Sequence, residues 1–111
     1  MQIERQSIGT VVVLSPKGRL DGTSCPAFEA EVLAALESSS GRLAVDLAGL
    51  DYISSAGLRV LLIAAKRSKA SGGKVVLSGM RPEIREVFDI SGFSAIFQIL
   101  PGRDEAIAAF A

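Results

Sequence analysis

Residues 42–62, RLAVDLAGLDYISSAGLRVLL, join a short apolar run to an amphipathic segment through two adjacent serines. The run 42–48 is almost continuously apolar, which is typical of a strand covered on one or both faces. Within 56–70, apolar residues recur at the i, i+3, i+4, i+7 spacing of a helix with one buried face: Leu58, Leu61, Leu62 and Ala65. The stretch predicts a strand, then a helix, with the serines at the junction.

Outward from this junction, similar patterns divide the rest of the chain. Further strands are predicted at 2–6, 10–15, 74–79 and 96–100. Further helices are predicted from Gly22 to Ser38, from Pro82 to Ser91, and from an Asp104 cap to Phe110. The order β-β-α-β-α-β-α-β-α, with a hairpin turn near Ser7–Gly9, predicts an α/β fold: a small mixed sheet of four or five strands with helices mainly on one face.

Composition narrows the classes of function. Hydrophobic residues make up 49% of the 111-residue chain, enough for a single packed domain over 1–111. Lys plus Arg and Asp plus Glu number 12 each, so no net charge attracts nucleic acid, and we expect no such partner. The longest apolar run, 60–65, is too short to cross a bilayer, so we expect a cytoplasmic protein without direct membrane insertion.

The absence of histidine limits the chemistry further. Ser-His-Asp and Cys-His mechanisms need an imidazole base, and the usual zinc sites need histidine or several cysteines. Cys25 is the only cysteine, so no disulfide can form within the chain, which suits a reducing cytosol. We therefore expect no catalytic residue, no metal and no cofactor.

The serine pair allows three interpretations. A serine just before a helix commonly caps it by accepting a backbone hydrogen bond. A hydrolase nucleophile needs glycine two places earlier, but Ile53 stands at that place before Ser55. A phosphoryl group on Ser55 would lie against the unpaired N–H groups of the helix start, where the small Ala56 and Gly57 leave the backbone open. The capping and phosphate interpretations are both kept.

Two other positions carry reactive or charged side chains near a predicted helix start. Cys25 precedes Pro26, where a helix N-terminus can lower a thiol pKa, although a buried structural cysteine is the commoner case. Asp21, in GRLDG at 18–22, is expected to cap the first helix or to brace a turn. The pair Gly72-Gly73 lacks the spacing of a phosphate loop and predicts a helix stop.

Three segments together resemble a known family. They are GRLDG at 18–22, DLAGLDYISSAGLRVLL at 46–62 and GGKVVLSGMRPEIREVFDISGF at 72–93. In this order and at this spacing they resemble the STAS domain of bacterial anti-sigma factor antagonists. The resemblance covers nearly the whole chain and implies a mixed sheet backed by helices, in agreement with the predicted element order.

The resemblance also implies a partner-switching role without enzymatic activity. In this family the unmodified antagonist binds an anti-sigma factor that is also a serine kinase, which releases a sigma factor. The kinase phosphorylates a serine just before the Gly-Leu helix start, the complex dissociates, and a serine phosphatase restores the antagonist. The family pattern places the phosphorylated residue at Ser55. Asp21 matches a loop aspartate that family members place beside the same partner surface. We therefore expect a partner-binding surface around the helix start, made of Asp21, Ser54, Ser55, Gly57, Leu58 and Arg59.

The chain departs from the family pattern at two positions. Ser54 stands where an aspartate is usual, and Ala56 stands where a second hydroxyl is usual. Loss of the acidic neighbour could change which kinase recognises the site or make Ser54 a competing acceptor. An alternative is therefore a constitutive STAS scaffold subunit of a transporter or stress-signalling assembly that is not phosphorylated. A third class, a small enzyme using Ser55 or Cys25, is disfavoured by the lack of histidine.

Overall fold

The computed structural model describes residues 1–111, and the chain begins with a hairpin. Strand β1 (Gln2–Ile8) pairs antiparallel with β2 (Val11–Leu20). Ile8 lies opposite Val11, so a two-residue turn at Gly9 joins the strands. Gly9 has a φ of 60°, a left-handed conformation that glycine adopts without steric cost. The predicted hairpin is confirmed.

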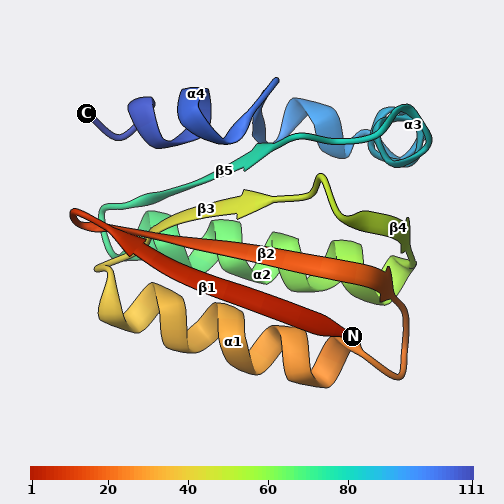
Figure 1. The fold of residues 1–111 in the computed structure, drawn as a ribbon, viewed down its shortest axis with the longest axis horizontal. Helices are drawn as coiled ribbons and strands as arrows, with labels where there is room; N and C mark the ends of the chain where they lie inside the picture. The colour runs from red at the N-terminus through yellow and green to blue at the C-terminus, as the bar shows by residue number, and fades with distance from the viewer.

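Parallel strands extend the sheet on the other side of β2. They are β3 (Arg42–Asp46), β5 (Lys74–Ser78) and β6 (Gln98–Leu100). The order across the sheet is β1-β2-β3-β5-β6, in which only β1 is antiparallel to its neighbour (Figure 1). Helices join these parallel strands because each connection must return the chain to the same end of the sheet. The predicted mixed α/β fold is confirmed.

The sheet has six strands, one more than the largest number predicted. The additional strand, β4 (Leu50–Ile53), pairs in parallel with the far end of β2. It finds a partner there because β2 runs to Leu20, five residues beyond the predicted strand end at residue 15. Pairing of β2 with β3 ends at Leu14, and pairing with β4 begins at Gly18 and includes a bulge. Pro16 lies opposite Ile3 of β1 but falls between the parts of β2 that pair with β3 and β4, so no partner is paired with it on that side.

Four α-helices connect and cover the strands. They are α1 (Cys25–Ser38), α2 (Ser55–Ala70), α3 (Pro82–Ser91) and α4 (Arg103–Ala108). A 3₁₀ turn, η1 (Phe93–Ala95), delays the start of β6 from the predicted residue 96 to Gln98. The predicted cap on α4 is wrong, because Asp104 lies inside the first turn and Gly102 precedes the helix. No helix combines the length and the apolar character needed to span a bilayer.

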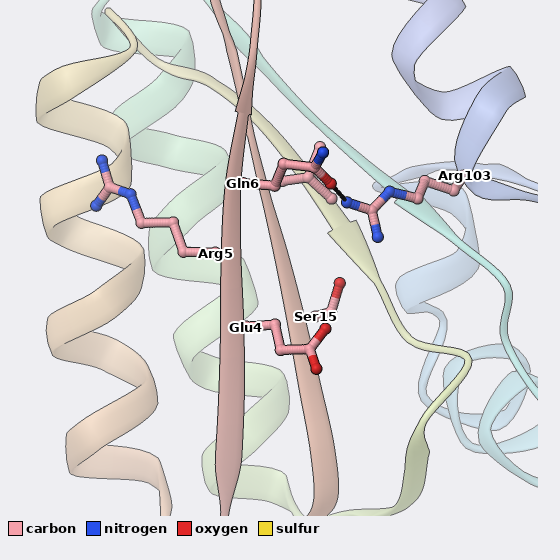
Figure 2. Close-up of a pocket in the computed structure, with 6 residues that line it drawn as sticks. Glu4, Arg5, Gln6, Ser15 and Arg103 are labelled. Atoms are coloured by element: carbon pink, nitrogen blue, oxygen red, sulfur yellow. Dashed lines mark hydrogen bonds between the residues drawn. The ribbon is translucent and has the colours of Figure 1, made fainter.

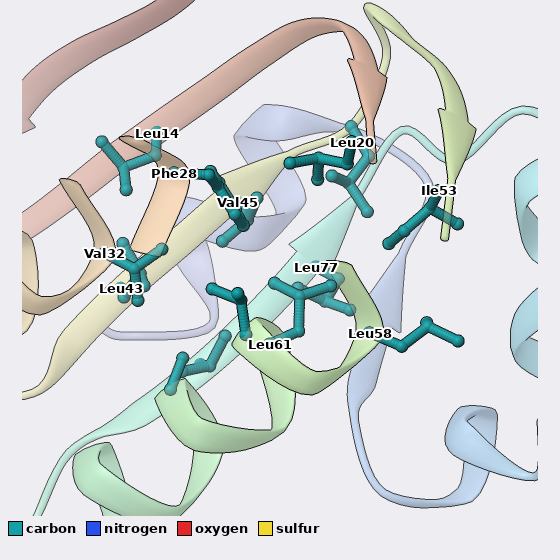
Figure 3. Packing of buried hydrophobic residues seen from close by; sticks show 14 of the residues in the cluster. Leu14, Leu20, Phe28, Val32, Leu43, Val45, Ile53, Leu58, Leu61 and Leu77 are labelled. Carbon is teal, nitrogen blue, oxygen red and sulfur yellow. The ribbon is translucent and has the colours of Figure 1, made fainter. Parts of the chain in front are cut away.

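The helices cover the two faces of the sheet unequally. Alternate residues of the central strands form a cluster of 22 buried residues with α1, α2 and α3 (Figure 3). The intervening strand residues and α4 form a separate cluster of five: Val11, Val13, Ala44, Val76 and Ala106. Figure 1 shows α1 and α2 side by side, with α4 apart from them. The prediction of helices mainly on one face is confirmed, and α4 is the exception.

Candidate functional site

The two serines occupy different positions where β4 meets α2. Ser54 precedes the helix, and its Oγ accepts a hydrogen bond from the Gly57 N–H at 3.4 Å. The Ser54 N–H donates to the Leu20 carbonyl at 2.8 Å, which ties the junction to the end of β2. Ser55 is the first helical residue and is exposed. Ser54 therefore caps α2, and the hydroxyl open to solvent is that of Ser55.

Gly57 allows α2 to begin close against the sheet. A Cβ at this position would lie 2.8 Å from Ile53 Cγ1 and 3.2 Å from Leu20 Cβ, inside normal carbon–carbon contact. Leu58 is only 7% exposed and belongs to the large core, where Figure 3 shows it at the start of the helix. Gly57 and Leu58 thus lie beneath the surface and fix the position of Ser55 above them.

The loop between β2 and α1 lies beside this helix start, because Asp21 directly follows Leu20. Asp21 Oδ1 accepts hydrogen bonds from the N–H groups of Thr23 at 3.0 Å and Ser24 at 3.2 Å. These bonds, that of Ser24 most strongly, lower the pKa of the Asp21 carboxyl below its ordinary value. Asp21 therefore braces the turn, which is one of its two predicted roles, and its carboxylate does not cap α1.

A groove runs between the first turns of α1 and α2 and borders Ser55. It is lined by Gly22, Cys25, Pro26 and Glu29 on one side and by Ala56, Arg59, Val60 and Ile63 on the other. Arg59 is exposed at the rim, one helical turn beyond Ser55. Ser55 directly precedes Ala56 of this lining and therefore lies next to a concave surface that is half apolar and carries one anion, Glu29, and one cation, Arg59.

Cys25 lies in this groove but is not an activated thiol. Its side chain is buried, and desolvation raises the pKa of the Cys25 thiol, outweighing the opposite effect of the Ser54 hydroxyl. A thiol with a raised pKa is protonated at neutral pH and is a poor nucleophile. The interpretation of Cys25 as a buried structural cysteine is confirmed.

A more polar cavity of about 350 Å³ lies on the α4 face of the sheet, between β1, β2 and the start of α4. Figure 2 shows Gln6 and Arg103 joined by a hydrogen bond across it, while Arg5 points away toward α1. Two of its three charged residues are paired, because Glu4 contacts Lys17 at 2.9 Å and Arg103 lies 3.8 Å from Asp46. The third, Arg5, donates a hydrogen bond to Ser38 outside the cavity, so no unpaired charge points into it.

The chain matches the family model of the STAS domain over residues 2–106. It belongs to the STAS-domain family, as the resemblance of the three sequence segments implies. A curated relative from Bordetella bronchiseptica, named as a candidate anti-sigma factor antagonist, BtrV, is 39% identical over 110 residues. The match covers 99% of this chain and 95% of that protein.

Solved structures share the fold at low sequence identity. A candidate anti-sigma factor antagonist from Thermotoga maritima superposes with a TM-score of 0.90 at 21% identity, over 97% of this chain and 93% of that one. The anti-sigma factor antagonist SpoIIAA in its unphosphorylated form gives 0.82 at 21% identity, over 96% and 93% of the two chains. The phosphorylated form of SpoIIAA from Bacillus gives 0.78 at 20% identity, over 99% and 100%.

Two further residues, Arg19 and Tyr52, belong to the surroundings of the candidate site, although sequence patterns do not reveal them. The guanidinium of Arg19 lies 4.2 Å from the centre of the Tyr52 ring, which is 40% exposed, so a cation covers an aromatic side chain two residues before Ser54. The strand that supplies Tyr52, β4, has two buried ends and two exposed middle residues over Leu50–Ile53, so it lacks the alternation that would predict a strand.

Proposed function

We propose that this protein is an anti-sigma factor antagonist controlled by phosphorylation of Ser55 in the cytoplasm. Unphosphorylated, it binds an anti-sigma factor that is also a serine kinase, and a sigma factor is released. A serine phosphatase reverses the modification, and the protein itself is not an enzyme. The observation that carries the proposal is that the two serines differ in environment. Ser54 caps α2 through the Gly57 N–H, whereas Ser55 is exposed to solvent next to the groove. The name of the Bordetella relative supports the same role.

The fold tolerates a phosphoryl group at this position. Ser55 begins α2, whose first turn has no acidic residue and whose N–H groups carry partial positive charge. The groups that hold α2 in place, Gly57 and Leu58, are buried below the modified surface. Phosphorylation therefore changes the docking surface without disturbing the core.

A phosphate at Ser55 is sufficient to dissociate a moderately strong complex. It adds about −1.5 to −2 charges at neutral pH. Against one partner carboxylate about 4 Å away, each unit of charge costs about 4 kcal/mol at an effective dielectric constant near 20. A micromolar complex has a binding free energy of about 8 kcal/mol, so losing half of it weakens binding about a thousandfold. The proposed contact surface around Ser55 includes the exposed Arg59. Ser54 and Asp21 lie beside it, and the buried Gly57 and Leu58 position it from below.

Phosphate transfer tests the assignment of the acceptor. The protein is incubated with ATP and its cognate anti-sigma factor kinase, and the phosphorylated residue is located by mass spectrometry. We expect phosphate on Ser55, none on Ser55→Ala, and normal transfer to Ser54→Ala. The Ser54→Ala variant is the matched control, because it keeps the exposed hydroxyl and loses only the cap, at about 1 kcal/mol of stability. Transfer to Ser54 in the wild-type chain would contradict the assignment.

Binding of the same anti-sigma factor tests the electrostatic mechanism. We expect Ser55→Glu to keep the thermal unfolding curve of the wild type and to lose at least about a hundredfold in affinity, or about 2.8 kcal/mol. The uncharged Ser55→Ala variant should bind like the wild type. If Ser55→Glu binds as tightly as Ser55→Ala, the phosphate does not act as a switch, and the constitutive scaffold interpretation is favoured.

A further inference from the structure

We propose that α2 carries a second docking surface at its other end, for an acidic amphipathic helix of a partner protein. The surface is a groove, called here the lysine groove, between the second half of α2 and the segment that leads into β6. Its apolar floor is formed by Leu62, Ala65, Val75, Ile96 and Phe97. Its rim carries the cations of Lys66 and Lys69.

The floor of the lysine groove presents apolar side chains to solvent. Phe97 and Val75 are each 7% exposed and close the base of the groove. Ile96 is 51% exposed and is one of only two isoleucines among the exposed large hydrophobic residues, with Ile90 of α3 as the other. Leu62 and Ala65 are half-buried on the facing side of α2. An apolar helix face laid in this groove would cover them, in the way that amphipathic helices dock in hydrophobic grooves.

The charge around the lysine groove specifies an acidic occupant. Between Asp51 and Glu83 the chain has no acidic residue, and its basic residues are Arg59, Lys66, Arg67, Lys69, Lys74 and Arg81. Neither rim lysine takes part in the ion pairs of the fold. Lys74 also contributes to the lining, but its Nζ lies 5.3 Å from the centre of the Phe110 ring, which packs on the α4 face of the sheet. The helix dipole accounts for the cations in the last turn of α2, Arg67 and Lys69, whereas Lys66 precedes that turn.

The lysine groove lies too far from Ser55 to share its switch. The nearer rim lysine, Lys66, follows Ser55 by 11 residues (66 − 55) in the same helix, which at 1.5 Å per residue corresponds to about 16 Å along the axis. This exceeds the Debye length of about 8 Å at physiological ionic strength. A partner bound in the lysine groove should therefore stay bound when Ser55 is phosphorylated, and the proposal is independent of the function proposed above.

A peptide titration followed by NMR tests the proposal. The probe is a blocked peptide of about 15 residues with leucines along one helical face and glutamates on both flanks. We expect amide shifts at 62–69, 73–75 and 96–97, and none at 54–58. The double variant Lys66→Glu/Lys69→Glu should bind at least about tenfold more weakly. A Ser55→Glu variant should bind within about twofold of the wild type.

Arg67 supplies the matched control, because it lies in the same turn of α2, is exposed and does not line the groove. Arg67→Glu should change the affinity by less than about twofold. Equal weakening by Arg67→Glu and Lys69→Glu would overturn the proposal, since binding would then reflect only the general charge of the helix. Equal binding of a peptide with lysine in place of glutamate would also overturn it. A third outcome would overturn it as well: amide shifts at the groove caused by decanoate, a fatty-acid anion, but not by the peptide, because the groove would then bind a small amphiphile and not a helix.

Discussion

Gly57 is the residue at which α2 comes closest to the sheet. In an open helix, replacing glycine by alanine stabilises by about 1 kcal/mol, since alanine has the higher helix propensity. At Gly57 the added methyl group would meet Ile53 at 2.8 Å. We therefore predict that Gly57→Ala lowers the free energy of unfolding by about 1–3 kcal/mol, measured by urea denaturation.

The control for this prediction is Gly22→Ala. A Cβ at Gly22 meets no atom within 4 Å, and its φ is not in the left-handed region. This substitution should change the free energy of unfolding by less than about 0.5 kcal/mol. A stabilised Gly57→Ala variant would show that the helix start can move away from the sheet, which the model of a fixed Ser55 does not allow.

Cys25 should react slowly with alkylating agents in the folded protein. Its thiol is buried and its pKa is raised, so little thiolate is present at pH 8. We predict that iodoacetamide labels native Cys25 far more slowly than the urea-unfolded chain, as followed by mass spectrometry. Equal labelling rates in the folded and unfolded states would contradict this prediction.

The raised pKa of Cys25 also affects stability at high pH. Since the unfolded thiol ionises at lower pH than the folded one, the free energy of unfolding should fall as the pH rises above about 8.5.

The β2–α1 loop depends on an ionised carboxylate. The pKa of Asp21 is lowered in the folded state, so its contribution to stability is present above the unfolded pKa and is lost as the pH falls through the folded value. We predict that Asp21→Ala unfolds at lower urea concentration than the wild type at pH 7. The difference between the two midpoints should shrink below about pH 4. A difference that stays constant down to pH 2 would mean that Asp21 acts through packing alone.

Elements with a complete local pattern are those that the sequence predicts best. The apolar spacing and the Gly72-Gly73 stop define α2, and Pro82 and Gly92 delimit α3. Strand β4 escapes prediction because four residues carry little pattern, and its partner is the far end of β2, some 30 residues earlier. The extension of β2 through Pro16 is not predicted for the same reason, since the strand pairing that accommodates the proline involves residues distant in sequence.

The candidate site also has features that the sequence predicts and features that it does not. The position of Ser55 at a helix start follows from neighbouring residues, and the structure confirms that it is exposed. Which serine caps α2 depends on the backbone angles of Ser54, which the serine pair itself does not determine. The contact between Arg19 and Tyr52 depends on the pairing of β2 with β4 and cannot be read from either segment alone.

Across the whole molecule, α4 is the only helix that covers the second face of the sheet. Ala106 is fully buried there, and Ile107 and Phe110 pack around it. We predict that a chain ending at Gly102 keeps its helical far-ultraviolet circular dichroism but loses about 2–4 kcal/mol of stability, because apolar area on the sheet is exposed. Size-exclusion chromatography should show self-association through this face. Unchanged stability would mean that α4 is detached in solution.

The distribution of charge has a consequence for how partners approach. Helix α1 carries Glu29, Glu31 and Glu37 and no basic residue, while the adjacent α2 carries only cations. Although the formal net charge is zero, the molecule is therefore electrically polarised across this helix pair. An incoming charged protein experiences a torque before contact, so productive collisions are favoured and association slows as salt is added. A protein with zero net charge can thus still be oriented by the electric field of a charged partner.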